Sequence, residues 1–168
     1  MPELKNFRKV TTGIYRGGQP DRKALEELVE EGFKTVVSFR WQKIIVEQEA
    51  KDCRDLGLEF VSIPLNYSNP PSLGDIKNFL NILEDSRMHP VFVHCLHGKD
   101  RTGIMVAIYR IIDQDWPVQE AYKEMEECGF HKYRLRPFKW HLFKFANNLE
   151  KNLLLLKTEK KNGNWQSQ

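Results

Sequence analysis

The sequence predicts an α/β fold, in which a twisted, mostly parallel central sheet of four to five strands is flanked by helices on both faces. Short runs rich in β-branched residues alternate with amphipathic helical runs, as in βαβ units. Three of the six helical runs stop at a glycine, and no internal repeat or linker divides the chain. The 168 residues suit one domain, predicted over residues 1–157, with residues 158–168 as a flexible polar tail.

The first half of the chain supplies strands that enclose two helices. Ala24, Leu25, Leu28 and Val29 share one face of the first helix, and Gly32 can end it. The second helix stops at Gly57 in the same way. Strands are expected within residues 11–20, 34–40 and 59–65, helices at 21–32 and 44–57, and a loop rich in turn formers at 66–72.

The second half of the chain is mostly helical. Apolar residues recur at helical spacing from Ile76 to Leu83, and Ser72 with Asp75 reads as a capping box at the start of that helix. A run that is nearly all apolar predicts a helix buried on most sides over residues 102–113. The other elements expected are a buried strand at residues 90–94, a helix at 117–129 and one last long helix at 137–156.

Composition excludes several classes of protein. The formal net charge of +3 is too weak to indicate a nucleic-acid-binding protein, but it suits an anionic substrate. The cysteines Cys53, Cys95 and Cys128 form neither a CxxC pair nor a zinc spacing, and their odd number favours a reducing compartment. No signal peptide is visible, and no apolar run approaches the roughly 20 residues that span a bilayer. We therefore expect a cytoplasmic protein, monomeric, without a transmembrane segment, a metal or a cofactor.

The stretch "VHCLHGKDRTG" is the candidate functional site, because it leaves a buried strand and enters a buried helix. Ligands of α/β sheets bind at such carboxyl ends of strands. Successive N–H groups of the turn through Gly98, together with the helix N-terminus, form an anion-binding nest. Arg101 adds a planar fork for two phosphate oxygens, and the same positive field lowers the pKa of Cys95. The turn would hold a phosphate over a thiolate, which suits nucleophilic attack on phosphorus.

This stretch resembles the active-site loop of the protein tyrosine phosphatase superfamily, HCxxGxxRT. The matching residues are His94, Cys95, Gly98, Arg101, Thr102 and Gly103. The segments "YRGGQP" and "VVSFR" also look like the opening segments of the atypical dual-specificity group. The resemblance covers most of the chain, and it implies a parallel-rich sheet flanked by helices and a metal-free reaction through a cysteinyl phosphate.

The resemblance also implies roles for single residues. Cys95 would be the nucleophile, and Arg101 would bind phosphate and stabilise the transition state. Thr102 would hydrogen-bond the thiolate as it leaves, and His94 would brace the loop through its ring hydrogen bonds. The residues expected to surround the substrate phosphate are Leu96, His97, Gly98, Lys99, Asp100 and Arg101.

The general acid departs from the family pattern. Such phosphatases usually carry an aspartate on a separate loop some thirty residues before the cysteine, but residues 63–72 contain no carboxylate here. Asp100 within the loop is one replacement, as in some relatives, and its alternative reading is a partner for Arg or Lys. Asp75 is the weaker replacement, because the capping box already accounts for it. A good leaving group or water would remove the need for a strong acid.

The substrate class follows from the extra cations. Lys99 in "GKDRTG" looks like family members that act on phosphoinositides or inositol polyphosphates, in which several phosphates are neutralised together. The basic run from Lys132 to Lys139 either rims such a pocket or is a solvated face. A phosphotyrosine or dual-specificity protein phosphatase is the alternative, and a phosphoanion-binding pseudophosphatase without turnover is a second one.

Overall fold

The computed structural model describes residues 2–158 and contains one five-stranded sheet in the order β1-β2-β5-β3-β4. Only β1 runs antiparallel to its neighbour, so the predicted mostly parallel sheet is confirmed. The strands are β1 (Arg8–Thr11), β2 (Ile14–Gly17), β3 (Thr35–Ser38), β4 (Glu59–Ser62) and β5 (Val91–His94).

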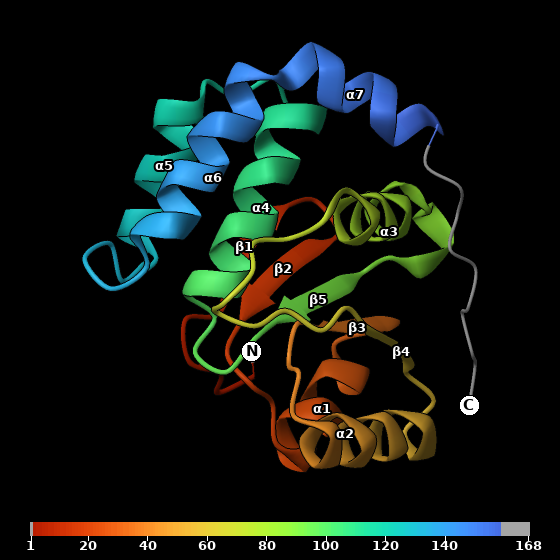
Figure 1. The fold of residues 1–168 in the computed structure, drawn as a ribbon. Coiled ribbons are helices and arrows are strands. Elements are labelled where there is room, and N and C mark those ends of the chain that lie inside the picture. The colour runs from red at the N-terminus through yellow and green to blue at the C-terminus, as the bar shows by residue number, and fades with distance from the viewer. Residues whose placement is uncertain (1, 159–168) are drawn as a thin grey trace.

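The register of the central strands sets the position of the candidate site. His94 at the end of β5 lies opposite Gly17 on β2 and Ser38 on β3. All three strands therefore end at one edge of the sheet, with β5 between the other two (Figure 1). The segments that follow the three strands therefore lie together at this edge, which is where α/β sheets bind ligands.

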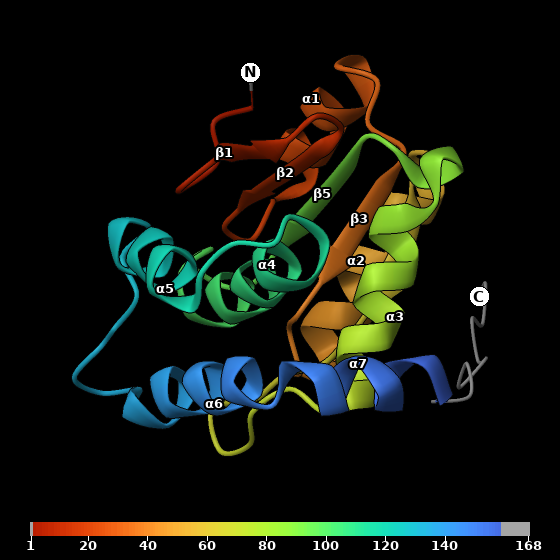
Figure 2. The same ribbon diagram turned by 90° about the horizontal axis from the view of Figure 1, so that it is seen from above.

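Helices cover both faces of the sheet, as predicted (Figures 1 and 2). Alternate residues of β5 serve the two faces: Phe92 packs in the smaller core beside the first two helices, whereas Val91 and Val93 pack in the larger core. The helices are α1 (Arg22–Glu30), α2 (Lys43–Asp55), α3 (Leu73–Glu84), α4 (Asp100–Asp113), α5 (Val118–Glu127), α6 (Arg136–Asn147) and α7 (Leu149–Thr158), with the short 3-10 helix η1 (Ser86–Met88).

Helix α4 leaves the candidate site and runs through the larger core. Its residues from Asp100 to Ile111 are all buried, which confirms the predicted helix without a solvated face. Because neighbours surround its first turn, the side chains there keep fixed positions. Among the described residues, no helix is long and apolar enough to cross a membrane.

The prediction of one last long helix over residues 137–156 was wrong, because α6 and α7 are separate helices that meet at Asn148. The Asn148 side chain donates to the carbonyl of Lys144 at 2.9 Å, and that of Asn152 donates to Phe145 at 3.0 Å. Asparagine side chains that bond the backbone compete with the helical ladder and end it. Of the predicted tail, Thr158 is the last residue of α7, and residues 159–168 lie outside those described. The domain boundary at residue 157 stays a prediction.

Candidate active site

The loop from Cys95 to Lys99 joins β5 to α4, and its carbonyl groups are held from outside. Asn6 Nδ2 donates to the carbonyl of His97 at 2.8 Å, and the backbone N–H of Gln19 donates to that of Leu96 at 3.2 Å. Arg16 Nη2 donates to the carbonyl of Gly98 at 2.9 Å. A loop whose carbonyls point outward turns its N–H groups inward, so the geometry is that of an anion nest.

Gly98 makes the tight turn of the loop possible. Its φ of +66° lies in the left-handed region, and a Cβ there would stand 2.4 Å from the carbonyl carbon of Gly17. The backbone of the loop therefore rests directly on the backbone at the end of β2. A glycine is required by the conformation and by the close approach together.

Arg101 and Thr102, on the first turn of α4, carry polar atoms that are ready for a ligand. Arg101 is 1% exposed, and its Nη1 donates to the carbonyls of Leu65 at 3.3 Å and Phe39 at 3.4 Å. Its Nε and the Thr102 Oγ1 are buried without a hydrogen-bond partner among the described residues. The Tyr67 ring covers the guanidinium, with its centroid 4.8 Å from Arg101 Cζ. Buried donors without partners are costly unless an anion binds them.

His94 connects the loop to α2 through a buried network. Its Nε2 lies 2.5 Å from Glu49 Oε1, and its Nδ1 lies 3.3 Å from the carbonyl of Cys95. Glu49 Oε2 accepts from Gln19 Nε2 at 2.9 Å, and Gln19 Oε1 accepts from Arg40 Nη1 at 2.8 Å. The expected ring hydrogen bonds of His94 are therefore present. Sequence analysis missed Glu49, which is 4% exposed on α2, because nothing in the sequence distinguishes it from the exposed Glu47 of the same helix.

Two more buried arginines surround Cys95, and sequence analysis did not single out either. Arg16 is 2% exposed, and burial lowers the pKa of its guanidinium, whereas Cys128, Glu124 and Cys95 raise it. Arg40 is 3% exposed and follows β3. The available signal was a charged residue within or just after a buried strand, at the edge of the sheet where the loop lies.

Asp100 joins the loop to the segment between α5 and α6. Its Oδ1 accepts from the backbone N–H of His131 at 2.9 Å, and its Oδ2 lies 2.8 Å from His131 Nδ1. The imidazole is 43% exposed, whereas the carboxylate side chain is 4% exposed. A buried carboxylate thus orients a half-exposed imidazole at the edge of the loop. Sequence analysis gave no role to His131.

Lys99 and His97 complete the outer side of the loop. The Lys99 stem lies against Gly129, where an added Cβ would approach Lys99 Cε to 3.0 Å. Burial lowers the pKa of His97, and the neighbouring charges of Lys99 and Lys5 lower it further. His97 therefore holds a proton less readily than an ordinary histidine, and Lys99 is the cation that the loop itself adds beside Arg101.

The structure accounts for Asp75 as a helix cap at the start of α3. Asp75 Oδ2 accepts from the backbone N–H and the hydroxyl of Ser72, at 2.9 and 2.8 Å. The Ser72 hydroxyl in turn accepts from the N–H of Asp75 at 3.1 Å, which completes the predicted capping box. The Asp75 carboxylate is therefore bonded within its own turn.

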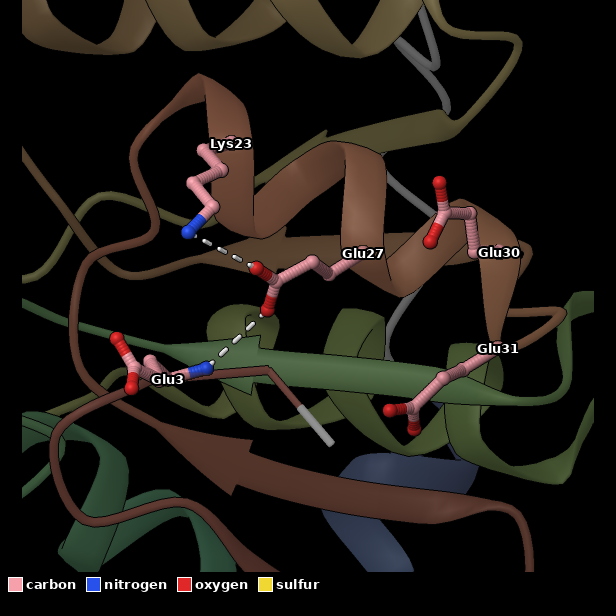
Figure 3. Close-up of a pocket in the computed structure, with 5 residues that line it drawn as sticks. All are labelled: Glu3, Lys23, Glu27, Glu30 and Glu31. Atoms are coloured by element: carbon pink, nitrogen blue, oxygen red, sulfur yellow. Dashed lines mark hydrogen bonds and ion pairs between the residues drawn. The ribbon is translucent and has the colours of Figure 1, made fainter.

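A separate surface pocket beside α1 is acidic (Figure 3). Glu27 accepts from the backbone N–H of Glu3 at 3.2 Å and lies 3.7 Å from Lys23 Nζ. No group of three or more His, Cys, Asp or Glu in residues 2–158 could hold a metal ion. The pocket has neither a nucleophile nor a concentration of positive charge, so the loop after β5 remains the candidate site.

Comparisons with known proteins find relatives among phosphatases. The dual specificity protein phosphatase TpbA of Pseudomonas aeruginosa is 30% identical over 125 residues, which are 74% of this chain and 55% of TpbA. The chain thus spans about half the length of that relative. Inositol diphosphatase DSP5 of Arabidopsis thaliana is 28% identical over 146 residues, 80% of this chain and 67% of that protein.

The fold is shared with a solved structure, the core catalytic domain of the PP-IP phosphatase SIW14 from S. cerevisiae. The two chains superpose with a TM-score of 0.74 at 19% identity, over 94% of each. A family model described as PTP-NADK, a DSP-PTPase phosphatase fused to NAD+ kinase, matches residues 4–140. That match includes every strand of the sheet, the loop after β5 and all of α4. Because the match covers most of the chain, the chain belongs to this family of DSP-type phosphatases.

Proposed function

We propose that this protein is a cysteine-dependent phosphomonoester hydrolase that acts through a phosphocysteine on inositol polyphosphates or phosphoinositides. One observation carries the proposal. Cys95 begins an anion nest beside Arg101, whose buried Nε has no partner among the described residues. A buried nucleophile that shares its loop with unused donors suits phosphoryl transfer, in which positioning and charge stabilisation dominate.

In the proposed reaction, the Cys95 thiolate attacks phosphorus while the nest and Arg101 bind the nonbridging oxygens. The S–P bond forms, the bond to the leaving oxygen breaks, and that oxygen takes up a proton. Water then attacks the phosphocysteine, inorganic phosphate leaves, and the electron pair of the S–P bond returns to sulfur. Thr102 Oγ1, which has no hydrogen-bond partner within residues 2–158, is a donor for the departing thiolate.

The proton for the leaving oxygen is assigned to the Asp100–His131 pair. Both Asp100 oxygens are engaged with His131, so Asp100 exchanges protons with substrate and water through the half-exposed imidazole. Asp75 remains the weaker candidate, because both capping hydrogen bonds would break if it moved. A positioned acid of this kind contributes about 10²–10⁴-fold to the rate.

Two features support the inositol phosphate substrate. Lys99 and the buried arginines add more positive charge to the site than a single phosphate requires. Relatives named inositol diphosphatases in Arabidopsis thaliana align over most of the chain. A phosphotyrosine or dual-specificity protein phosphatase is the second candidate, supported by the similarity to TpbA.

The test is a panel that pairs inositol hexakisphosphate with a phosphotyrosine peptide and p-nitrophenyl phosphate, read as released phosphate. Cys95→Ser should release no phosphate while still binding the anions in calorimetry. Cys53→Ser is the matched control, since Cys53 is also fully buried but lies in the smaller core. Absence of phosphate release by the unmodified protein, with anion binding retained, would establish a pseudophosphatase instead.

A further inference from the structure

Arg40 is a buried cation at the active site that the mechanism above does not use. It follows Phe39, whose carbonyl accepts from Arg101 and whose N–H donates to the carbonyl of His94 at 2.9 Å. Arg40 therefore directly follows a residue whose backbone contacts His94, before the loop, and Arg101, after it. Its side chain is enclosed on the same edge of the sheet, with the whole residue 3% exposed.

The Arg40 guanidinium is oriented by neutral groups only. Its Nη1 donates to Gln19 Oε1 at 2.8 Å, and its Nε donates to Gln42 Oε1 at 3.2 Å. Its Nη2 has no hydrogen-bond partner among the described residues. The nearest carboxylate in this network, Glu49, is bonded to Gln19 and His94 and makes no ion pair with Arg40. The network thus fixes the direction of the cation and leaves its charge unpaired.

Arg40 and Arg101 lie close enough to influence each other. Burial lowers the pKa of Arg40 and the charge of Arg101 lowers it further, whereas the nearby Glu49, Cys95 and Tyr67 raise it. Arg101 also lacks an ion pair, because its acceptors within residues 2–158 are backbone carbonyls. Two buried like charges that make no ion pair within residues 2–158 are unfavourable, and they are better compensated when an anion binds both. One dianionic phosphate on the nest and Arg101 leaves the charge of Arg40 for a second anionic group.

We propose that Arg40 binds a second phosphate of the substrate, directly adjacent to the one that Cys95 attacks. This inference rests on the proposed function and names its substrate class more narrowly. The adjacent phosphate belongs either to a neighbouring ring position or to a diphosphate group. Arg40 determines specificity, since it selects for substrates whose two phosphates are within reach of one another, and total charge alone does not satisfy it.

Two inositol trisphosphates test adjacency at constant charge. Inositol 1,4,5-trisphosphate has a vicinal pair of phosphates, whereas inositol 1,3,5-trisphosphate has three isolated ones. The unmodified protein should prefer the vicinal compound in kcat/KM, and Arg40→Gln should reduce that ratio at least tenfold. The second arm compares kcat/KM for inorganic pyrophosphate with kcat/KM for phenyl phosphate. An effect of Arg40→Gln on this ratio indicates a diphosphate group, whereas an effect on the trisphosphate ratio alone indicates phosphates on neighbouring ring positions. Arg87→Gln, on an arginine exposed on η1, is the control that keeps the ratio.

The ratio separates specificity from damage to the site, because loosening the Gln19 network would lower turnover of both substrates alike. Arg40→Lys keeps the charge but loses the planar fork, so an intermediate ratio is expected, and it replaces Arg40→Gln if that variant does not fold. The role of Arg40 is refuted if the variant, Arg40→Gln or its replacement Arg40→Lys, has the same kcat/KM ratio as the unmodified protein, within twofold, in both arms.

If no substrate is turned over, the proposed function fails by itself. The same ratio is then measured as dissociation constants by calorimetry, with Arg40→Gln compared in a Cys95→Ser background. Loss of the preference for adjacent phosphates in that comparison supports Arg40 without reference to catalysis. Its persistence refutes the role of Arg40 in binding.

Discussion

Replacing Gly98 with alanine tests whether the phosphate loop is held by contact with the end of β2. The new Cβ would stand 2.4 Å from the Gly17 carbonyl carbon, 2.5 Å from its oxygen and 2.8 Å from the Gly18 nitrogen. All three are backbone atoms, so no side chain can turn aside. The left-handed φ of +66° costs about 1–2 kcal/mol for a residue with a Cβ, and overpacking adds roughly 1–3 kcal/mol.

Gly57→Ala is the matched control, because its φ is +76° and nothing lies within 4 Å of the added Cβ. The difference between the two variants therefore isolates the clash, at about 1–3 kcal/mol, or roughly 2–12 °C in Tm for a chain of this size. Calorimetric melting measures it, and phosphate release should fall more than tenfold in Gly98→Ala alone. Equal melting temperatures and equal activities of the two variants would refute the close contact between loop and strand.

Two further predictions concern protons. Asp100→Asn and His131→Gln should each remove the basic limb of the kcat profile against pH, with a loss of about 10²–10⁴-fold for substrates with poor leaving groups and less for p-nitrophenyl phosphate; an unchanged limb in both variants contradicts the pair as the acid. Burial lowers the pKa of His141 from its ordinary 6.5, and Lys144 lowers it further, so the unfolded chain binds the proton more readily. The contribution of His141 to stability is therefore retained above about pH 6.5 and falls as the pH decreases through its lowered pKa in the folded protein. Denaturant titrations at pH 7.5 and 5.5 should show a smaller loss of unfolding free energy for His141→Gln than for the unmodified protein. An equal loss in both proteins argues against His141 as its source.

The fold was predictable from the sequence because its signals are local. Buried strands are short apolar runs, and the positions that end α1, α2 and α5 are followed by Gly32, Gly57 and Gly129, all with positive φ. The error at Asn148 has the same origin, since an apolar pattern that continues through a break conceals it. The break depends on side-chain bonds to carbonyls, and composition does not reveal those.

The candidate site was predictable only as far as it is contiguous. Cys95, Gly98 and Arg101 belong to one short stretch with six matching residues, and its position between a buried strand and a buried helix indicates a phosphate loop. Glu49 and His131 come from α2 and from the segment after α5, and they reach the loop only through the packing of those elements. A single sequence gives no sign of such contacts, because a buried glutamate and a solvated one look alike in it.

The two carboxylates nearest the loop explain why its positive field persists. Glu49 and Asp100 each bond a histidine, at the strand end and at the helix start of the loop respectively. Neither makes an ion pair with Arg101 or Arg40 within the described residues, so the carboxylates hold the loop in place while both arginines keep donors for a ligand. The same arrangement accounts for the missing acid of residues 63–72. In the proposed mechanism, a free carboxylate above the site would oppose the polyanionic substrate, whereas the His131 imidazole held by Asp100 would supply a proton without a standing negative charge at the entrance.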